Sequence, residues 1–67
     1  NIPYDRRMMI EILDLEGKRI DIISDGNIYK QGKNNIIWHS KNNPSGIYFF
    51  KIQDNNQTLV KKVILMK

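Results

Sequence analysis

A chain of 67 residues without cysteine forms one small domain that cannot rely on disulfide bonds or thiolate metal sites for its stability. A domain of this size buries only about 60% of the surface that its unfolded chain exposes, so a core and a buried catalytic cavity together have little room. The net charge is +4, but the eleven basic residues are scattered along the chain, which is typical of a solvated surface and excludes a dense basic patch for nucleic acid.

The chain lacks the sequence features of a membrane span and of a signal peptide. No apolar run approaches the ~20 residues needed to cross a bilayer. The first residues also lack the basic and then apolar pattern of an export signal. Because the chain does not begin with Met, we expect a fragment or processed piece of a longer protein, with any export signal outside it.

The first half of the chain predicts a β-hairpin preceded by an edge strand. Residues 1–5 place a proline between apolar residues, which suits an edge strand. Residues 8–14 alternate, with one fully apolar face and one mixed face, as in a half-buried antiparallel strand. Residues 14–18 form a turn in which Gly17 supplies a positive φ, and residues 18–24 resume the alternation. The fully apolar face consists of Met8, Ile10 and Ile12.

The middle of the chain predicts a crossing between two sheets. Residues 25–34 contain two glycines, two asparagines and only two large apolar side chains, so they are interpreted as a long connection. Residues 35–39 are predicted to form the next strand. Trp38, the largest apolar side chain of the protein, is predicted to be its core residue. Removing such a ring from a core typically costs ~3–5 kcal/mol.

The most apolar run of the chain follows a loop of turn-forming residues. Residues 40–46 are predicted to turn and residues 47–53 to form a central strand. Its side chains alternate, and the face without charge, formed by Tyr48, Phe50 and Ile52, should point to the core. A buried tyrosine hydroxyl needs a partner, so we predict that Tyr48 reaches a backbone group at the rim, as corner tyrosines do in β-sandwiches.

The last part of the chain predicts a second hairpin that ends in an edge strand. Residues 54–57 form a tight turn in which asparagine adopts the left-handed conformation. Residues 58–66 form the last strand, and Lys61 and Lys62 fall on its opposite faces, a common protection of sheet edges. No helix is predicted. Short strands separated by frequent turns indicate an all-β sandwich.

The polar residues do not form a catalytic or metal-binding pattern. His39 is the only histidine, and a zinc site needs three or four donors, so a rim position is favoured. The carboxylates of Asp14 and Glu16 flank a turn and suit solvation there. Three serines are predicted in turns and none has a glycine-flanked nucleophile elbow: Ser24, Ser40 and Ser45. We therefore predict no enzyme, no cofactor and no metal.

Two binding functions were weighed from the aromatic residues. Single-strand nucleic acid binders stack bases on exposed rings, but at least two of the three rings at 48–50 should belong to the core, so no nucleic acid partner is predicted. Carbohydrate binding through Tyr4, Tyr29 and Trp38 would suit a small sandwich, although Trp38 is better explained as the core residue.

The order of these motifs resembles a known family. The motifs, in chain order, are a hairpin at 10–20, a glycine-containing loop, Asn-Ile-Ile-Trp-His at 35–39, Pro-Ser-Gly-Ile-Tyr-Phe-Phe-Lys-Ile at 44–52 and Lys-Lys-Val-Ile-Leu-Met-Lys at 61–67. Together they are similar to the C-terminal sorting domain of type IX secretion substrates in Bacteroidetes. A more distant similarity is to the immunoglobulin-like domain of the flagellar hook-capping protein. The resemblance covers nearly the whole chain from Ile2 onward.

The resemblance implies a small immunoglobulin-like antiparallel β-sandwich of about six to seven strands. Residues 1–67 would form a single sorting domain that ends a larger secreted protein. An outer-membrane translocon would recognise it after passage through the periplasm, and a sortase-like peptidase would remove it while attaching the cargo to the cell surface. The recognition residues implied by the family motifs are Pro44, Gly46, Tyr48, Lys62 and Lys67.

Two departures from the family pattern accompany this resemblance. Asn55 and Asn56 replace the usual glycine before the last strand, and the Asn-Pro-rich first strand of complete members is missing or cut off. A missing strand would leave an open sheet edge that could recruit a partner strand, including one from a second copy. The alternative function is an accessory immunoglobulin-like structural or carbohydrate-binding module of a secreted enzyme.

Overall fold

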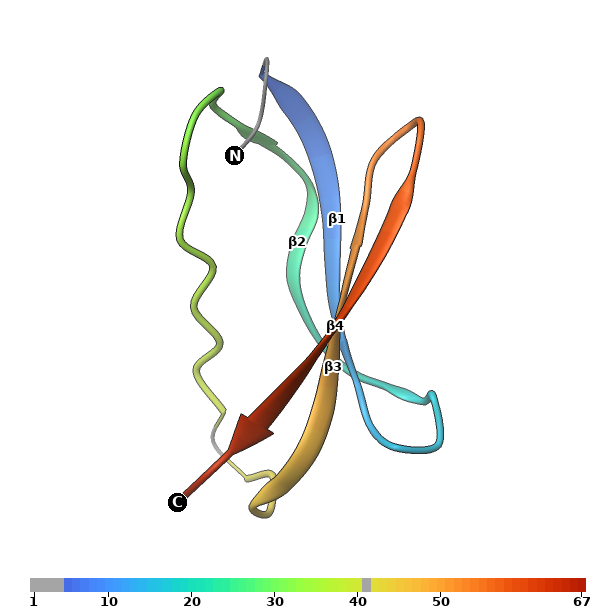
Figure 1. The fold of residues 1–67 in the computed structure, drawn as a ribbon, viewed down its shortest axis with the longest axis vertical. Coiled ribbons are helices and arrows are strands. Elements are labelled where there is room, and N and C mark those ends of the chain that lie inside the picture. Colours follow the sequence, from blue (N-terminus) through green and yellow to red (C-terminus); the bar gives the residue numbers. More distant parts are fainter. Residues whose placement is uncertain (1–4, 41) are drawn as a thin grey trace.

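Every regular element of the structure is a β-strand, in agreement with the alternation of apolar residues. The computed structural model describes residues 5–40 and 42–67, and no helix occurs within these ranges. The strands form one antiparallel sheet in the order β2-β1-β3-β4 (Figure 1). Their bounds are Arg6–Leu13 for β1, Arg19–Tyr29 for β2, Gly46–Gln53 for β3 and Thr58–Leu65 for β4.

The described residues contain fewer strands than the predicted sandwich. The described residues form four strands in one sheet, and the detail of a sandwich with six to seven strands is not confirmed. Of the predicted edge strand at residues 1–5, all but Asp5 lies outside the described residues. The all-β class is confirmed.

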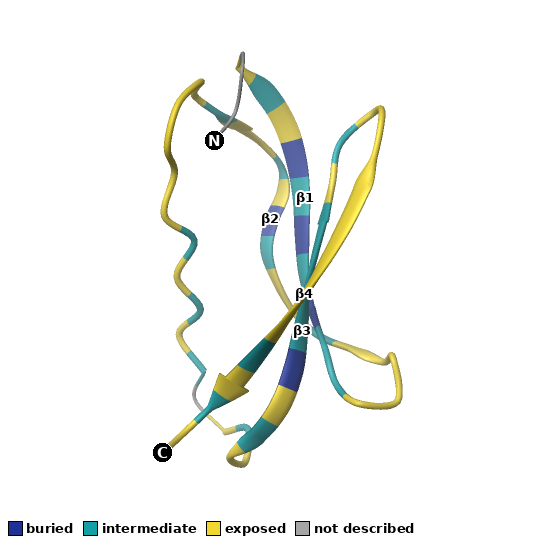
Figure 2. Cartoon of the chain, in the orientation of Figure 1, coloured by how far each residue is buried: buried dark blue, intermediate teal, exposed yellow. Residues whose placement is uncertain are grey.

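One face of the sheet forms the core. Met8 is 8% exposed, and Ile10 and Ile12 are fully buried, so the apolar face predicted for β1 is correct (Figure 2). The register pairs Ile10 with Ile52 and Ile12 with Phe50. Directly paired residues of antiparallel strands share a face, so the alternate residues of β3 also point to this side, as predicted.

Strand β2 is longer than predicted, because the first residues of the predicted loop continue the strand through a bulge. It continues to Tyr29, and the register shifts between Met8, paired with Asn27, and Met9, paired with Asp25. Gly26 is the extra residue, and its φ of +81° is open to glycine at little cost. The long connection predicted for residues 25–34 is therefore wrong for its first half.

Ser24 stabilises this bulge from inside the sheet. It was predicted to lie in a turn, but it lies in β2 and is only 1% exposed. Its hydroxyl donates to the carbonyl of Met8 at 2.8 Å and accepts from the N–H of Asn27 at 3.2 Å. These bonds satisfy a buried hydroxyl that would otherwise be costly.

The predicted strand at 35–39 is extended but pairs with no described strand. Its even-numbered residues are half-buried and its odd-numbered ones exposed from residue 35 to 40, so burial alternates along it as in a strand. What is missing is a neighbouring backbone to complete the hydrogen bonds, and no second sheet receives this segment within the described residues. In Figure 1 it runs alongside the sheet as a separate strap, a name used below for residues 33–40.

Trp38 attaches the strap to the core face of the sheet. Its ring meets Tyr48 edge to face, with centroids 5.2 Å apart, and Phe50 at 6.4 Å. Its indole N–H donates to the carboxylate of Asp21 on β2 at 2.8 Å. The ring is half-buried rather than enclosed, so the prediction of a fully buried core residue is only partly correct.

Both hairpin turns are organised by an aspartate. The Asp14 carboxylate accepts hydrogen bonds from the N–H groups of Glu16 and Lys18, each at 2.9 Å, and Gly17 has the predicted positive φ. In the β3–β4 turn the left-handed asparagine predicted from Asn55 and Asn56 is wrong, because no non-glycine residue in the described ranges has a positive φ. The Asp54 side chain shapes that turn instead.

Candidate functional site

The residues that start β3 form a tyrosine corner, defined here as residues 44–48. The Tyr48 hydroxyl donates a hydrogen bond to the backbone carbonyl of Pro44 at 2.6 Å. Tyr48 is 6% exposed, so its ring belongs to the core while its oxygen fixes the loop. The predicted contact of Tyr48 with a backbone group is confirmed.

The corner also holds the end of β4. Gly46, the first residue of β3, pairs with Leu65 near the end of β4. Two residues further on, the backbone N–H of Lys67 donates to the Ser45 hydroxyl at 3.0 Å. The structure therefore brings together four of the five residues implied by the family motifs: Pro44, Gly46, Tyr48 and Lys67.

Lys62 does not join this group. It pairs with Phe49 in the middle of the β3–β4 ladder, on the face of the sheet opposite the core. Lys61 pairs with Phe50 and points to the core side, so the predicted placement of the two lysines on opposite faces is confirmed. Both are exposed.

Strand β4 is an exposed edge of the sheet. It pairs with β3 on one side and with no other strand in the described part of the chain. Residues 58–62 are all exposed, and apolar residues remain accessible on both faces. The exposed fractions are 50% for Leu59, 53% for Val60, 66% for Ile64 and 84% for Met66.

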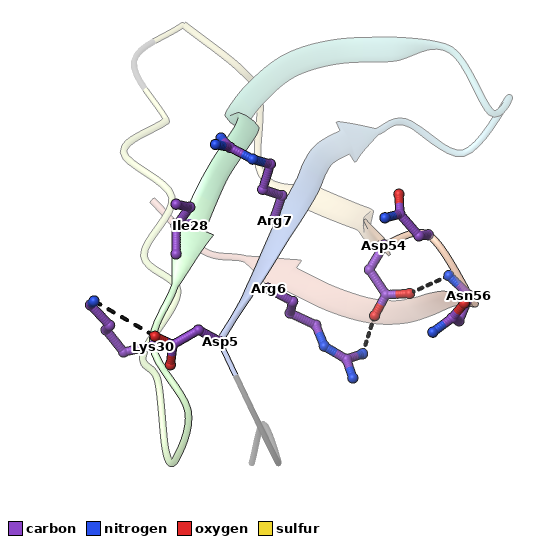
Figure 3. A pocket seen from close by; sticks show the side chains of 8 residues that line it. Asp5, Arg6, Arg7, Ile28, Lys30, Asp54 and Asn56 are labelled. Atoms are coloured by element: carbon purple, nitrogen blue, oxygen red, sulfur yellow. Dashed lines mark hydrogen bonds and ion pairs between the residues drawn. The ribbon is translucent and has the colours of Figure 1, made fainter.

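Asp54 fixes the opposite end of the β3–β4 hairpin. Its carboxylate accepts from the backbone N–H groups of Asn56 at 2.8 Å and Gln57 at 3.0 Å, and from the guanidinium of Arg6 at the start of β1 (Figure 3). The Asn56 N–H is the largest cause of a lowered pKa of the Asp54 carboxyl. The Gln57 N–H and Arg6 act in the same direction and burial opposes them, so the carboxylate remains ionised.

The remaining polar residues do not form a reactive cluster. His39 is exposed on the strap, as its sequence context indicated. Among residues 5–40 and 42–67, no three histidine, cysteine or acidic side chains gather where they could hold a metal ion. The same residues contain no helix that could cross a membrane.

Sequence reasoning did not identify Ser45, Asp54 or Arg6 as important. Two signals were available. Ser45 lies between the proline and the glycine of the loop, where a hydroxyl readily bonds to backbone, and Asp54 directly precedes two asparagines at a hairpin turn. The pairing of Arg6 with Asp54, 48 residues away, leaves no local signal.

These features define a class of protein: a small all-β module whose last strand is exposed along one edge and tied at its end to a tyrosine corner. The chain belongs to the family of secretion system C-terminal sorting domains, whose profile matches residues 1–66. No curated protein and no solved structure matches the chain. The resemblance to the type IX sorting domain is confirmed.

The family gives the function of the domain. It is a C-terminal sorting signal of type IX secretion, and it belongs to a secreted or cell-surface protein. A family of sorting signals is not catalytic. The alternative of an accessory carbohydrate-binding module is not favoured, and Tyr4, one residue of that alternative, lies outside the described residues.

Proposed function

We propose that residues 1–67 act as a single sorting domain that directs a larger cargo protein from the periplasm through the outer-membrane translocon. A sortase-like peptidase then removes the domain and attaches the cargo to the cell surface. The observation that supports this proposal most directly is the family match over residues 1–66. The exposed, tethered β4 supports it from the structure.

The five motif residues are proposed to divide into two roles. Tyr48 is buried and its hydroxyl is already bonded to Pro44, so these residues, with Gly46, hold the corner in shape rather than meeting the translocon. Lys62 projects from the middle of an exposed edge, and Lys67 stands where the corner fixes the end of that edge. We propose that the translocon contacts β4, including Lys62, and Lys67 just after its end.

The same edge explains how a partner could bind. An exposed edge strand presents unpaired backbone N–H and C=O groups to which an extended segment can add. A translocon segment with acidic side chains would complement Lys61 and Lys62. Self-association of two copies through this edge is opposed by those lysines and by the net charge of +4 on each copy.

The immunoglobulin-like sandwich of six to seven strands is part of this proposal. The strap alternates like a strand and lies over the core face through Trp38, which is the position of a second layer. Further strands paired with the strap would complete that layer and cover Ile37, which is 65% exposed.

The test uses a reporter that carries the domain in a host competent for type IX secretion. Deletion of Val63 to Lys67, or replacement of both Lys62 and Lys67 by glutamine, should abolish or strongly reduce delivery to the surface. Replacement of Lys18 and Lys33 by glutamine is the control, since both are exposed and the change in charge is the same. Normal delivery of the first two variants, with intact folding, refutes the proposed role of β4.

A further inference from the structure

A small apolar hollow lies on the core face of the sheet, beside the free edge of β4. Its volume is about 190 Å³, and its walls come from the strap, β3 and β4: Trp38, Phe50, Val63, Ile64 and Leu65. The rings of Trp38 and Phe50 meet edge to face in this wall. Ile64 pairs with Ile47, so its side chain belongs to the opposite face, and its presence in the lining shows that the hollow extends to the edge of β4.

The volume of the hollow determines the size of its occupant. Small-molecule sites in proteins typically measure roughly 300–1,000 Å³, so this hollow is smaller than such a site. An apolar cavity of about 150 Å³ holds a benzene ring. The hollow therefore has room for one aromatic or branched aliphatic side chain, which a larger molecule would bring to it.

The backbone beside the hollow can receive an extended segment. The N–H of Asp54 donates to the carbonyl of Gln57 at 3.0 Å, so this pair is hydrogen-bonded. Hydrogen-bonded and non-hydrogen-bonded pairs alternate along an antiparallel ladder, and the β3–β4 register runs from the turn without a shift. The N–H and C=O groups of Val60, Lys62 and Ile64 therefore point away from β3, towards the free edge.

A lysine on the same face restricts the partner further. Lys61 and Val63 pair with Phe50 and Tyr48, so their side chains lie on the core face two residues apart. Lys61 is exposed and forms no ion pair with a carboxylate in the described ranges. In an added strand, the residues opposite Lys61 and Val63 would share this face. An acidic side chain is complementary at the first position and a large apolar one at the second.

We infer that β4 binds an extended segment of the translocon that carries a large apolar residue opposite Val63 and an acidic residue two positions away, opposite Lys61. Backbone hydrogen bonds along the edge supply affinity, and the hollow beside Trp38 supplies specificity. A second copy of β4 fits poorly, because it would bring lysines to the edge instead of an acidic residue. The inference rests on the proposed role of β4 in sorting and names the chemistry of its partner.

The test is a titration of the chain of residues 1–67 with the end-blocked peptide Thr-Glu-Thr-Phe-Thr-Glu-Thr. Its pattern is the same in both strand directions. Trp38 is the only tryptophan of the chain, so its fluorescence reports the filling of the hollow and should change in a saturable manner. Replacement of the phenylalanine by alanine should weaken binding at least ~tenfold, because the ring is no longer buried. Replacement of both glutamates by glutamine should weaken it ~two- to fivefold, as expected for an exposed ion pair.

Two matched variants locate the charge that the peptide recognises. In Lys61→Gln the preference for the glutamate peptide over the glutamine peptide should disappear. Lys62→Gln makes the same change on the opposite face of the same strand and should keep most of that preference. Hydrogen exchange locates the backbone contact, since the peptide should slow exchange of the amides of Val60, Lys62 and Ile64.

Three results would overturn the inference. They are equal binding of the phenylalanine and alanine peptides, a glutamate preference that is lost in Lys62→Gln instead of Lys61→Gln, and protection of the three edge amides without peptide, which would assign the edge to a second copy. Surface delivery of the reporter is a separate measurement. If delivery depends on Lys62 and Lys67 but the peptide does not bind, only this inference fails; normal delivery of those variants refutes the sorting role of β4 whatever the peptide does.

Discussion

Substitution of Tyr48 by phenylalanine isolates the hydrogen bond of the tyrosine corner. The ring keeps its place between the sheet and Trp38, while the bond to the Pro44 carbonyl is lost. Pro44 itself is an exposed residue, and its bond with Tyr48 is only partly buried. The change therefore removes one intramolecular bond at the rim of the core rather than in its centre.

The expected cost follows from this geometry. A hydrogen bond with these properties contributes a net ~1 kcal/mol to the free energy of unfolding. In a domain of 60–100 residues, 1 kcal/mol moves Tm by roughly 4–8 °C. Substitution by alanine also removes a buried ring, which typically costs ~3–5 kcal/mol for an aromatic residue. The two variants should thus differ clearly.

Thermal unfolding followed by circular dichroism, with urea unfolding as a second measurement, checks these values. Tyr29→Phe is the matched control, because the Tyr29 side chain is half-buried in β2 and forms no hydrogen bond with another described residue; its Tm should change by less than about 2 °C. If Tyr48→Phe unfolds at the same temperature as the unchanged chain, the corner contributes nothing to stability and its proposed structural role is wrong.

Three further substitutions test other parts of the fold. Folding lowers the pKa of Asp54 from its ordinary 3.8, so its contribution to the free energy of unfolding is complete above pH 3.8 and is lost as the pH falls further. Asp54→Asn should therefore reduce the difference between the urea midpoints measured at pH 6 and at pH 3. In Gly26→Ala the added Cβ has no other atom within 4 Å, but the residue must adopt a φ of +81°, which disfavours any side chain. Urea unfolding should therefore show that the free energy of unfolding falls by about 1–2 kcal/mol, and a change near zero would mean that the bulge relaxes. Trp38→Ala should cost less than the ~3–5 kcal/mol of an enclosed ring, since Trp38 is half-buried; a larger loss by the same measurement would show that the strap organises the whole core.

The parts of the fold that the sequence predicted depend on strict alternation. Strands β1 and β3 lie in the middle of the sheet, and their apolar faces were read directly from residues 8–12 and 48–52. The corner was predictable for the same reason, because a tyrosine in a core position must find a partner for its hydroxyl.

The errors occurred where local sequence has two solutions. A glycine among polar residues marks either a loop or a bulge, and at Gly26 only the register against β1 decides between them. Residues 35–39 were predicted to form a strand, but their local sequence cannot show whether another strand pairs with them. The hollow beside β4 and the Arg6–Asp54 pair depend on residues far apart in sequence, so no local pattern could indicate them.

The direction of the strands determines how the domain responds to mechanical load. Strands β1 and β4 run parallel, because each is antiparallel to β3 between them, so residues 6 and 65 lie at opposite ends of the sheet (Figure 1). Tension between these ends loads the hydrogen bonds of the β1–β3 and β3–β4 ladders in shear. Tension between residues 46 and 65, which pair at one end of the β3–β4 hairpin, instead opens that hairpin one hydrogen bond at a time. A sorting signal pulled through its outer positions thus resists extension more strongly than one gripped at its corner.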